Sequence, residues 1–282
     1  MATAFLGTGV GGPARVALIG VPYDRTQSFR RGAAAGPRAV REASWSLETY
    51  SPVLDMDMLE AGVRDLGDLD VADLDPPAMV RRVQEAVAGL GPGVVPVLLG
   101  GDHTVTVGAV GALAARFPQL RAVVLDAHLD LRHQYEGSPW SHACTVRRLW
   151  EALGDARVAL LGVRSGLKEE WEFARRHCRW VGGSLALPEA VHAELRGYPV
   201  YLSVDLDVAD PAYAPGVGNP EPGGPALSEV LQALYLLRGL SVVGMDLVEV
   251  APGLDPSGAT AVAAAKLVRE MVLAFCGSAP AR

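Results

Sequence analysis

Four short apolar segments of the chain each run directly into acidic or histidine residues, and this repeated pattern constrains the fold more than any other feature. The segments are Val95–Leu99, Ala122–Leu125, Val200–Val204 and Val242–Met245. Short, nearly continuous runs rich in Val and Leu are typical of strands buried on both faces of a parallel sheet. Ligand sites in open α/β sheets lie just beyond the carboxyl ends of the strands. We therefore expect acidic and histidine residues from distant parts of the chain to meet in one crevice.

Helical patterns alternate with the predicted strands. Val16–Tyr23 is the first predicted strand, and residues 24–36 are expected to form a loop on the carboxyl-end face. Helices are expected over Gly36–Leu47, where a proline occupies the first turn, and over 80–90, where apolar residues follow helical spacing. Ser228 is expected to cap a later helix. Strand and helix alternation predicts an α/β fold with a doubly wound, mostly parallel sheet flanked by helices.

The length and the cysteine content indicate one ordinary domain. A chain of 282 residues with 50% hydrophobic and 20% charged residues can bury a full core. No linker is evident, so we expect a single domain over 1–282 with its core at about 16–268. Three cysteines without close spacing favour neither a disulfide framework nor a thiolate zinc site, which is typical of a reducing compartment.

Charge and the N-terminal segment narrow the possible partners. A net charge of −7 argues against nucleic acid and favours a small cationic ligand. Met1–Arg15 has no basic residue ahead of its weak apolar stretch, and no apolar run approaches the roughly 18 residues that span a bilayer. We expect a cytoplasmic protein with no membrane partner.

The strand ends carry a set of side chains suited to metal binding. If the backbone stays extended, Asp126, His128 and Asp130 place alternate side chains on one side, as do Asp205 and Asp207. His103 supplies a second imidazole. Two imidazoles and four carboxylates can hold two divalent cations when two carboxylates bridge, because four negative charges then balance four positive ones. Mixed imidazole and carboxylate ligands without thiolate suit Mn²⁺, with Co²⁺, Ni²⁺ and Zn²⁺ as alternatives.

Five motifs in the chain resemble the signatures of one known family. They are Gly100–His103 (GGDH), Asp126–Asp130 (DAHLD), Ser141–Cys144 (SHAC), Ser203–Gly216 (SVDLDVADPAYAPG) and Asp246–Pro252 (DLVEVAP). In this order they are similar to motifs of the ureohydrolases, the family of arginase and agmatinase. The likeness extends from Val16 to about Val268 and implies an arginase-like three-layer α/β/α fold.

The resemblance implies a two-manganese site that hydrolyses a guanidinium group to urea and an amine, by attack of a hydroxide that bridges the ions. Each ion would have four protein ligands, and two of the carboxylates would be shared. The implied sets are His103, Asp126, Asp130 and Asp205 for one ion, and Asp126, His128, Asp205 and Asp207 for the other. Two ions that share a water lower its pKa and present hydroxide at neutral pH.

Three residues are candidates for the remaining catalytic roles. Glu249 can accept hydrogen bonds from the guanidinium and hold its carbon atom in place. Asp130 can also accept a proton after the attack. His142 lies where the family carries a histidine that exchanges protons with solvent, a task that suits an imidazole.

Several of these residues also have ordinary structural interpretations. Asp102 could be a ligand but is expected to support a ligand through hydrogen bonds or to cap a helix, and Asp246 is expected to play the same supporting part ahead of binding a metal. Glu249 has a buried ion pair as its alternative. His133, His177 and His192 are interpreted as structural or surface histidines.

The substrate is less constrained than the chemistry. The segments 215–224 and 132–141 resemble agmatinases more than arginases, although Val217 and Asn219 stand where many agmatinases carry Thr. We expect agmatine or an aminopropylated agmatine, ahead of arginine and other guanidino acids. A deacetylase-like amidohydrolase and a non-catalytic binding protein of the same fold are two less favoured hypotheses. The resemblance also implies a homo-oligomer, a trimer or a hexamer, and a role in polyamine (putrescine or spermidine) biosynthesis.

Overall fold

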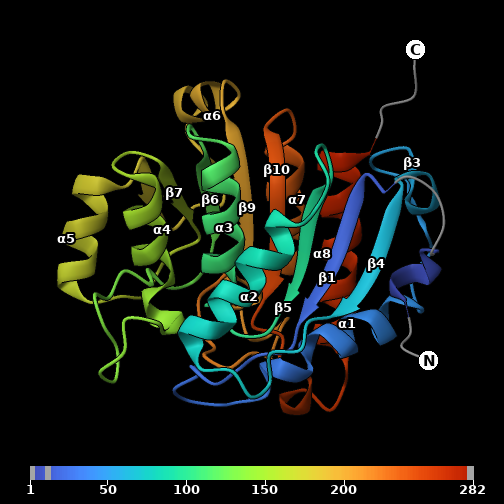
Figure 1. Cartoon of the computed structure of the whole chain (residues 1–282), viewed down its shortest axis with the longest axis horizontal. Coiled ribbons are helices and arrows are strands. Elements are labelled where there is room, and N and C mark those ends of the chain that lie inside the picture. The colour runs from blue at the N-terminus through green and yellow to red at the C-terminus, as the bar shows by residue number, and fades with distance from the viewer. Residues whose placement is uncertain (1–3, 10–13, 278–282) are drawn as a thin grey trace.

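The computed structural model describes residues 4–9 and 14–277, and it centres on one eight-stranded sheet (Figure 1). All neighbouring strands of this sheet are parallel. In spatial order the strands are β4 (Val63–Asp68), β1 (Val16–Val21), β5 (Val95–Gly100), β10 (Ser241–Val248), β9 (Pro199–Asp205), β6 (Arg121–Leu125), β7 (Val158–Leu161) and β8 (Trp180–Gly182). A small antiparallel pair, β2 (Tyr50–Ser51) and β3 (Met56–Asp57), lies apart from this sheet.

Helices cover both faces of the sheet and complete three layers (Figure 1). One face packs against α1 (Gly36–Ser44), α6 (Glu189–Leu195), α7 (Leu227–Leu236) and α8 (Ala259–Cys276). The other packs against α2 (Pro76–Ala88), α3 (Val105–Arg116), α4 (Thr145–Leu153) and α5 (Lys168–His177). The predicted α/β fold with a parallel sheet flanked by helices is confirmed.

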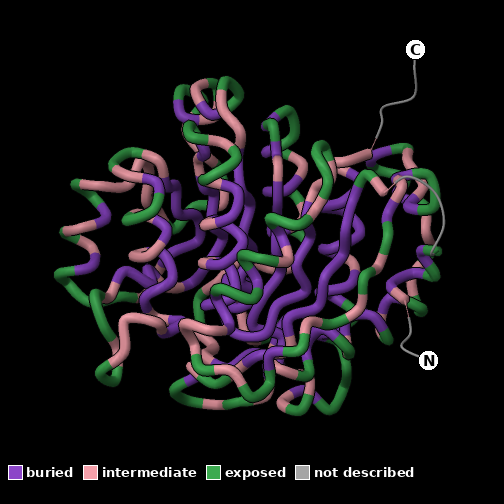
Figure 2. Tube along the Cα trace, in the orientation of Figure 1, coloured by how far each residue is buried: buried purple, intermediate pink, exposed green. Residues whose placement is uncertain are grey.

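Two apolar cores follow from the alternation of side chains along the buried strands. Leu18, Val97 and Leu99 belong to the core on the α8 side, whereas Ile19 and Leu98 belong to the core on the α3 side. Because the strands bury both faces, nearly every position in them is apolar, which explains the continuous runs in the sequence. Figure 2 shows the buried residues at the centre of the molecule, surrounded by exposed and intermediate residues.

The order of the strands places the functional motifs side by side. β5, β10, β9 and β6 are neighbours at the centre of the sheet, and they are the four apolar segments that end in acidic or histidine residues. Since these strands are parallel, their carboxyl ends lie at one edge. The predicted convergence of these four segments is confirmed.

Some element boundaries differ from the prediction. The first helix ends at Ser44 instead of Leu47. Ser228 is not an N-cap, because α7 begins at Leu227 and Ala226 precedes it. The carboxylate of Glu229 accepts the backbone N–H of Ala226 at 2.8 Å, which satisfies the start of the helix without Ser228.

The ends of the predicted domain, 1–3 and 278–282, and residues 10–13 of the N-terminal segment lie outside the described residues. In the part that the structure describes, no helix is both long and apolar enough to cross a membrane.

Candidate metal centre and active site

The ligand candidates lie on tight turns just beyond the strands. The condition of an extended backbone, under which alternate side chains would share one side, is not met at Asp130 or after Asp205. Asp130 has φ 48°, in the left-handed region, and Leu206–Val208 forms a 3₁₀ turn. A positive φ is uncommon for a residue with a side chain, and such residues gather at functional sites. Both turns nevertheless bring the acidic side chains to the same edge of the sheet.

The first group of ligand candidates surrounds His103. Its Nδ1 atom lies 3.2 Å from Asp126 Oδ2, 3.2 Å from Asp130 Oδ2 and 3.4 Å from Asp205 Oδ2. Ligand atoms of His103, Asp126 and Asp205 all lie within 4.8 Å of one another. His103 and Asp126 are fully buried, and Asp205 is 3% exposed.

The second group surrounds His128. Its Nδ1 atom lies 2.9 Å from Asp207 Oδ2 and 3.7 Å from Asp126 Oδ1. Ligand atoms of Asp126, His128 and Asp207 again lie within 4.8 Å of one another. Asp126 belongs to both groups, as a bridging ligand must.

The electrostatics of these groups fit positive ions. Burial and the neighbouring charge of Asp126 raise the pKa of Asp130 to about 6. Burial, Asp207 and Asp126 raise the pKa of Asp205 well above its ordinary value. Asp126 Oδ2 is buried and accepts no hydrogen bond. Unpaired buried carboxylate oxygens are costly, so this donor set is suited to divalent cations that would neutralise it.

Hydrogen bonds determine which nitrogen of His103 faces the carboxylates. Its Nε2 atom lies 3.1 Å from Ser203 Oγ, and Ser203 donates its hydroxyl hydrogen to Asp246 Oδ1 at 2.6 Å. Ser203 Oγ must therefore accept from the imidazole, so Nε2 carries the hydrogen. In the neutral ring the lone pair is then on Nδ1, the atom that faces the carboxylates and would bind a cation, and the ring orientation is fixed.

Asp246 supports this arrangement through hydrogen bonds, as expected. It also accepts from Tyr201 Oη at 2.6 Å and from Thr106 Oγ1 at 2.7 Å. Asp102 instead accepts from the backbone N–H of Thr104, directly before α3, at 3.2 Å. It also accepts from the backbone and hydroxyl of Thr26, which holds His142, at 3.0 and 2.8 Å.

Glu249 lies one residue past the end of β10 and has φ 68°. Its carboxylate accepts from the backbone N–H of His103 at 2.9 Å and from Gln27 Nε2 at 2.7 Å. Burial is the main cause that raises its pKa to about 7. No Lys or Arg pairs with Glu249 among residues 4–9 and 14–277, so the alternative of a buried ion pair finds no support.

His142 is held from the loop that follows β1. Its Nδ1 atom lies 2.7 Å from the carbonyl oxygen of Thr26, and its backbone N–H donates to Thr26 Oγ1 at 3.0 Å. Its Nε2 atom lies 3.4 Å from Ser28 Oγ and 3.3 Å from Asn219 Nδ2. Because Thr26 holds Nδ1, Nε2 is the nitrogen available for chemistry.

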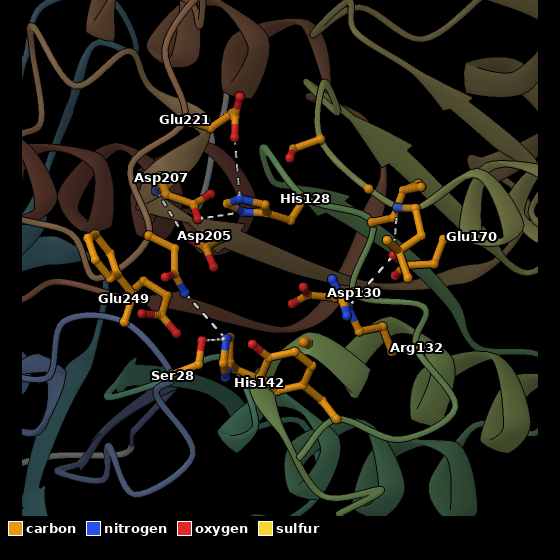
Figure 3. Close-up of a pocket in the computed structure, with 18 of the residues that line it drawn as sticks. Ser28, His128, Asp130, Arg132, His142, Glu170, Asp205, Asp207, Glu221 and Glu249 are labelled. Carbon is orange, nitrogen blue, oxygen red and sulfur yellow. Dashed lines mark hydrogen bonds and ion pairs between the residues drawn. The ribbon is translucent and has the colours of Figure 1, made fainter. Parts of the chain in front are cut away.

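One cavity of about 420 Å³ is lined by six of these side chains, His128, Asp130, His142, Asp205, Asp207 and Glu249, whereas His103 and Asp126 are not among its lining residues. Figure 3 shows His142 and the carboxylates of Asp130, Asp205 and Glu249 around a common central space. Glu221 lies beside His128, with 4.0 Å between Glu221 Oε2 and His128 Nε2.

A sequence model described as the arginase family matches residues 14–274. The chain belongs to this family. It is 40% identical over 269 residues to an agmatinase from Bacillus anthracis, covering 92% of this chain and 91% of that one. It is 42% identical over 271 residues to an N(1)-aminopropylagmatine ureohydrolase from Thermococcus kodakarensis, with 90% and 88% covered. The crystal structure of an agmatine ureohydrolase from Thermoplasma volcanium superposes with a TM-score of 0.86 at 34% identity, covering 97% of this chain and 94% of that one.

The three histidines interpreted as structural stay outside both ligand groups of this arginase-family chain. His177 pairs with Asp155 at 2.8 Å and lies against Phe173, with 4.3 Å between ring centroids. His133 is exposed, and His192 lies on the short helix α6; neither residue lines the cavity.

Sequence reasoning missed the neutral side chains that orient the charged ones. Thr26, Gln27 and Ser203 each hold a catalytic or ligand candidate, yet Ser, Thr and Gln are common residues with no spacing of their own. For Gln27, the only signal was its place in a loop expected at the same edge of the sheet.

Proposed function

We propose that the protein hydrolyses the guanidinium group of a guanidino-amine, agmatine or an aminopropylated agmatine, to urea and an amine, with two Mn²⁺ ions per chain. One observation carries this proposal. The two ligand groups, each of one histidine and two aspartates, share Asp126 and border the same cavity as Glu249. The similarity to relatives named agmatinase and aminopropylagmatine ureohydrolase supports the choice of substrate.

Six side chains would hold the cations, with Asp126 and Asp205 shared between them. They are His103, Asp126, His128, Asp130, Asp205 and Asp207. Two divalent cations there would lower the pKa of a water molecule and supply the nucleophile at neutral pH.

Glu249 would hold the substrate. In its ionised form, the carboxylate can accept N–H groups of a planar guanidinium while it retains its bonds from Gln27 and the backbone of His103. Those two bonds and the positive φ fix the carboxylate, so the guanidinium carbon is held in one place.

Two further groups would move protons. Asp130 would accept the proton of the attacking hydroxide once the carbon–oxygen bond has formed, and this proton can pass on to the departing nitrogen. His142 would exchange protons between the site and solvent through its Nε2 atom. The amine is a poor leaving group unless it is protonated, so the transfer to nitrogen is needed for the carbon–nitrogen bond to break.

The outer part of the cavity favours a cationic tail. Glu221 lines it with a partly exposed carboxylate, whereas Arg132 lies 3.9 Å from Glu170 and stacks over Tyr135 at 4.8 Å. Arg132, which could otherwise pair with the carboxylate of a guanidino acid, is thus already paired with Glu170. Hydrolysis of agmatine in this way would yield putrescine. We also propose, from the family resemblance, a cytoplasmic homo-oligomer of three or six chains.

Urea release from agmatine, aminopropylagmatine and arginine tests the proposal. After loading with Mn²⁺ and desalting, we expect two ions per chain and a kcat/KM for one of the amines at least about tenfold above that for arginine, or roughly 1.4 kcal/mol. Arginine equal to or better than both amines would contradict the substrate, and no urea from any of them would contradict the reaction.

A further inference from the structure

Asn219 is the one departure from the agmatinase pattern whose side chain lies against a candidate catalytic group. Its Nδ2 atom is 3.3 Å from His142 Nε2, and the residue lines the cavity. The other departure, Val217, is 1% exposed and belongs to the apolar core.

The hydrogen-bond pattern around His142 determines which atom of each group donates. The carbonyl oxygen of Thr26 can only accept, so His142 Nδ1 carries a hydrogen. In the neutral imidazole, Nε2 then has a lone pair and needs a donor. The amide of Asn219 meets this need when its NH₂ group faces the ring, which is the orientation in the structure.

The backbone places this amide firmly. Arg30 donates to the carbonyl oxygens of Val217 at 2.7 Å and Gly218 at 3.3 Å, directly before Asn219 in the chain. Pro220 follows and limits the backbone on the other side. A side chain anchored in this way can hold the imidazole against rotation.

An amide also suits the other protonation state of the ring. When Nε2 gains a proton it becomes a donor, and a half-turn of the amide presents the Oδ1 atom as an acceptor. The carboxylates of Asp102, Asp130 and Glu249 also act electrostatically on this ring. When ionised, none of these carboxylates can donate a hydrogen bond to neutral Nε2. Ser28 Oγ, 3.4 Å from Nε2, is a second possible donor, and the Asn219 amide at 3.3 Å is the nearer of the two.

We propose that Asn219 is a positioning residue that holds the His142 ring by its Nε2 atom in both protonation states. This inference rests on the proposed function, because it assigns Asn219 an effect on catalysis that acts through His142.

A double-mutant cycle tests the inference. Asn219→Leu keeps the size of the side chain and removes both hydrogen-bonding atoms. We expect it to lower kcat about tenfold, with KM changed less than about twofold and the metal content unchanged. In a His142→Ala background the same substitution should change kcat less than about twofold, because the ring it positions is absent.

A His133→Ala background is the control that shows whether losing any histidine, and not His142 in particular, changes the effect of Asn219→Leu. His133 is an exposed histidine outside the cavity, so Asn219→Leu should keep its full effect in a His133→Ala background. An equal loss of kcat with and without His142 would overturn the inference, since Asn219 would then act on the substrate or on the fold.

A second readout needs no substrate and stays decisive if the proposed reaction fails. In the Zn²⁺-loaded protein with ¹⁵N-labelled histidine, the His142 Nε2 resonance, assigned by its loss in His142→Ala, should shift in Asn219→Leu. An unchanged Nε2 resonance would overturn the inference independently of any activity.

Discussion

A single hydroxyl group determines which nitrogen of His103 is offered to a cation. Ser203 accepts the Nε2 hydrogen of His103 and donates its own hydrogen to Asp246. A histidine ligand without such a partner loses its preferred tautomer and its orientation, and metal affinity commonly falls by about 10–100-fold.

Ser203→Ala is therefore expected to weaken Mn²⁺ binding by about 10–100-fold while the protein remains folded. Isothermal titration calorimetry of the metal-free protein with Mn²⁺ measures this affinity. Thr106→Val is the matched control, because it removes another hydroxyl from Asp246 and leaves His103 untouched. Equal losses in both variants would mean that Asp246 acts on the site as a whole and not through Ser203.

At the scale of elements, one arginine joins two segments that border the site. Arg164 follows β7, and its guanidinium donates to the carbonyl oxygens of Asp207 at 3.0 Å, Val208 at 3.0 Å and Glu221 at 2.6 Å. It also donates to Gly162 at 3.2 Å. The turn that carries Asp207 and the loop that carries Glu221 are thus tied to the sheet by one side chain.

Arg164→Lys is expected to loosen both segments, because an ammonium has three donors and cannot span these carbonyl oxygens. We expect the free energy of unfolding to fall by about 1–3 kcal/mol and KM to rise about tenfold. Thermal unfolding and steady-state kinetics measure these effects. Arg157→Lys, at an arginine whose guanidinium donates to the carbonyl oxygen of Pro118 at 2.7 Å, is the control. A KM unchanged in Arg164→Lys would contradict the role of Arg164 in shaping the cavity.

The elements also show what the sequence could predict. The ends of β5, β6, β9 and β10 could be predicted from the sequence, because buried parallel strands consist of continuous apolar residues and Asp or His follows them directly. The turns beyond them were not visible, since a positive φ at Asp130 or Glu249 comes from tertiary contacts and not from residue type. The orienting hydroxyls and amides were missed for the same reason.

At the scale of the whole molecule, protons and cations compete for the site. Burial raises the pKa of Glu249 from 4.5 to about 7, and burial together with Asp126 raises that of Asp130 from 3.8 to about 6. Between about pH 4.5 and 7 the folded, cation-free protein thus binds more protons than the unfolded chain. Its stability must fall as the pH rises through this range. The raised pKa values of His103 and His128 act in the same direction at higher pH. The lowered pKa of Asp126 has the opposite sign but acts at more acidic pH, and that of His192, outside the ligand groups, cancels when loaded and cation-free protein are compared.

We expect the difference in Tm between Mn²⁺-loaded and cation-free protein to grow by at least about 5 °C as the pH rises from about 5 to about 7.5. Cations replace the protons, so the loaded protein escapes this loss of stability. Calorimetry of both forms across this range is the measurement. Glu249→Gln, which cannot ionise, should reduce the pH dependence of the cation-free form. A constant or shrinking difference in Tm would contradict the linkage.

The order of the strands also governs when the site can come into being during synthesis. β1, β4 and β5 precede β6, β7 and β8 in the chain. In the sheet β1 pairs with both β4 and β5, and β7 pairs with both β6 and β8. In the finished sheet these groups never touch, because β9 and β10 lie between them. We therefore expect a nascent chain to expose the unpaired edges of β5 and β6 until Pro199–Val248 has been made, and such edges favour wrong pairing. The candidate cation-binding residues that follow β5 and β6 can therefore come together only after β9 and β10 have paired between these two strands.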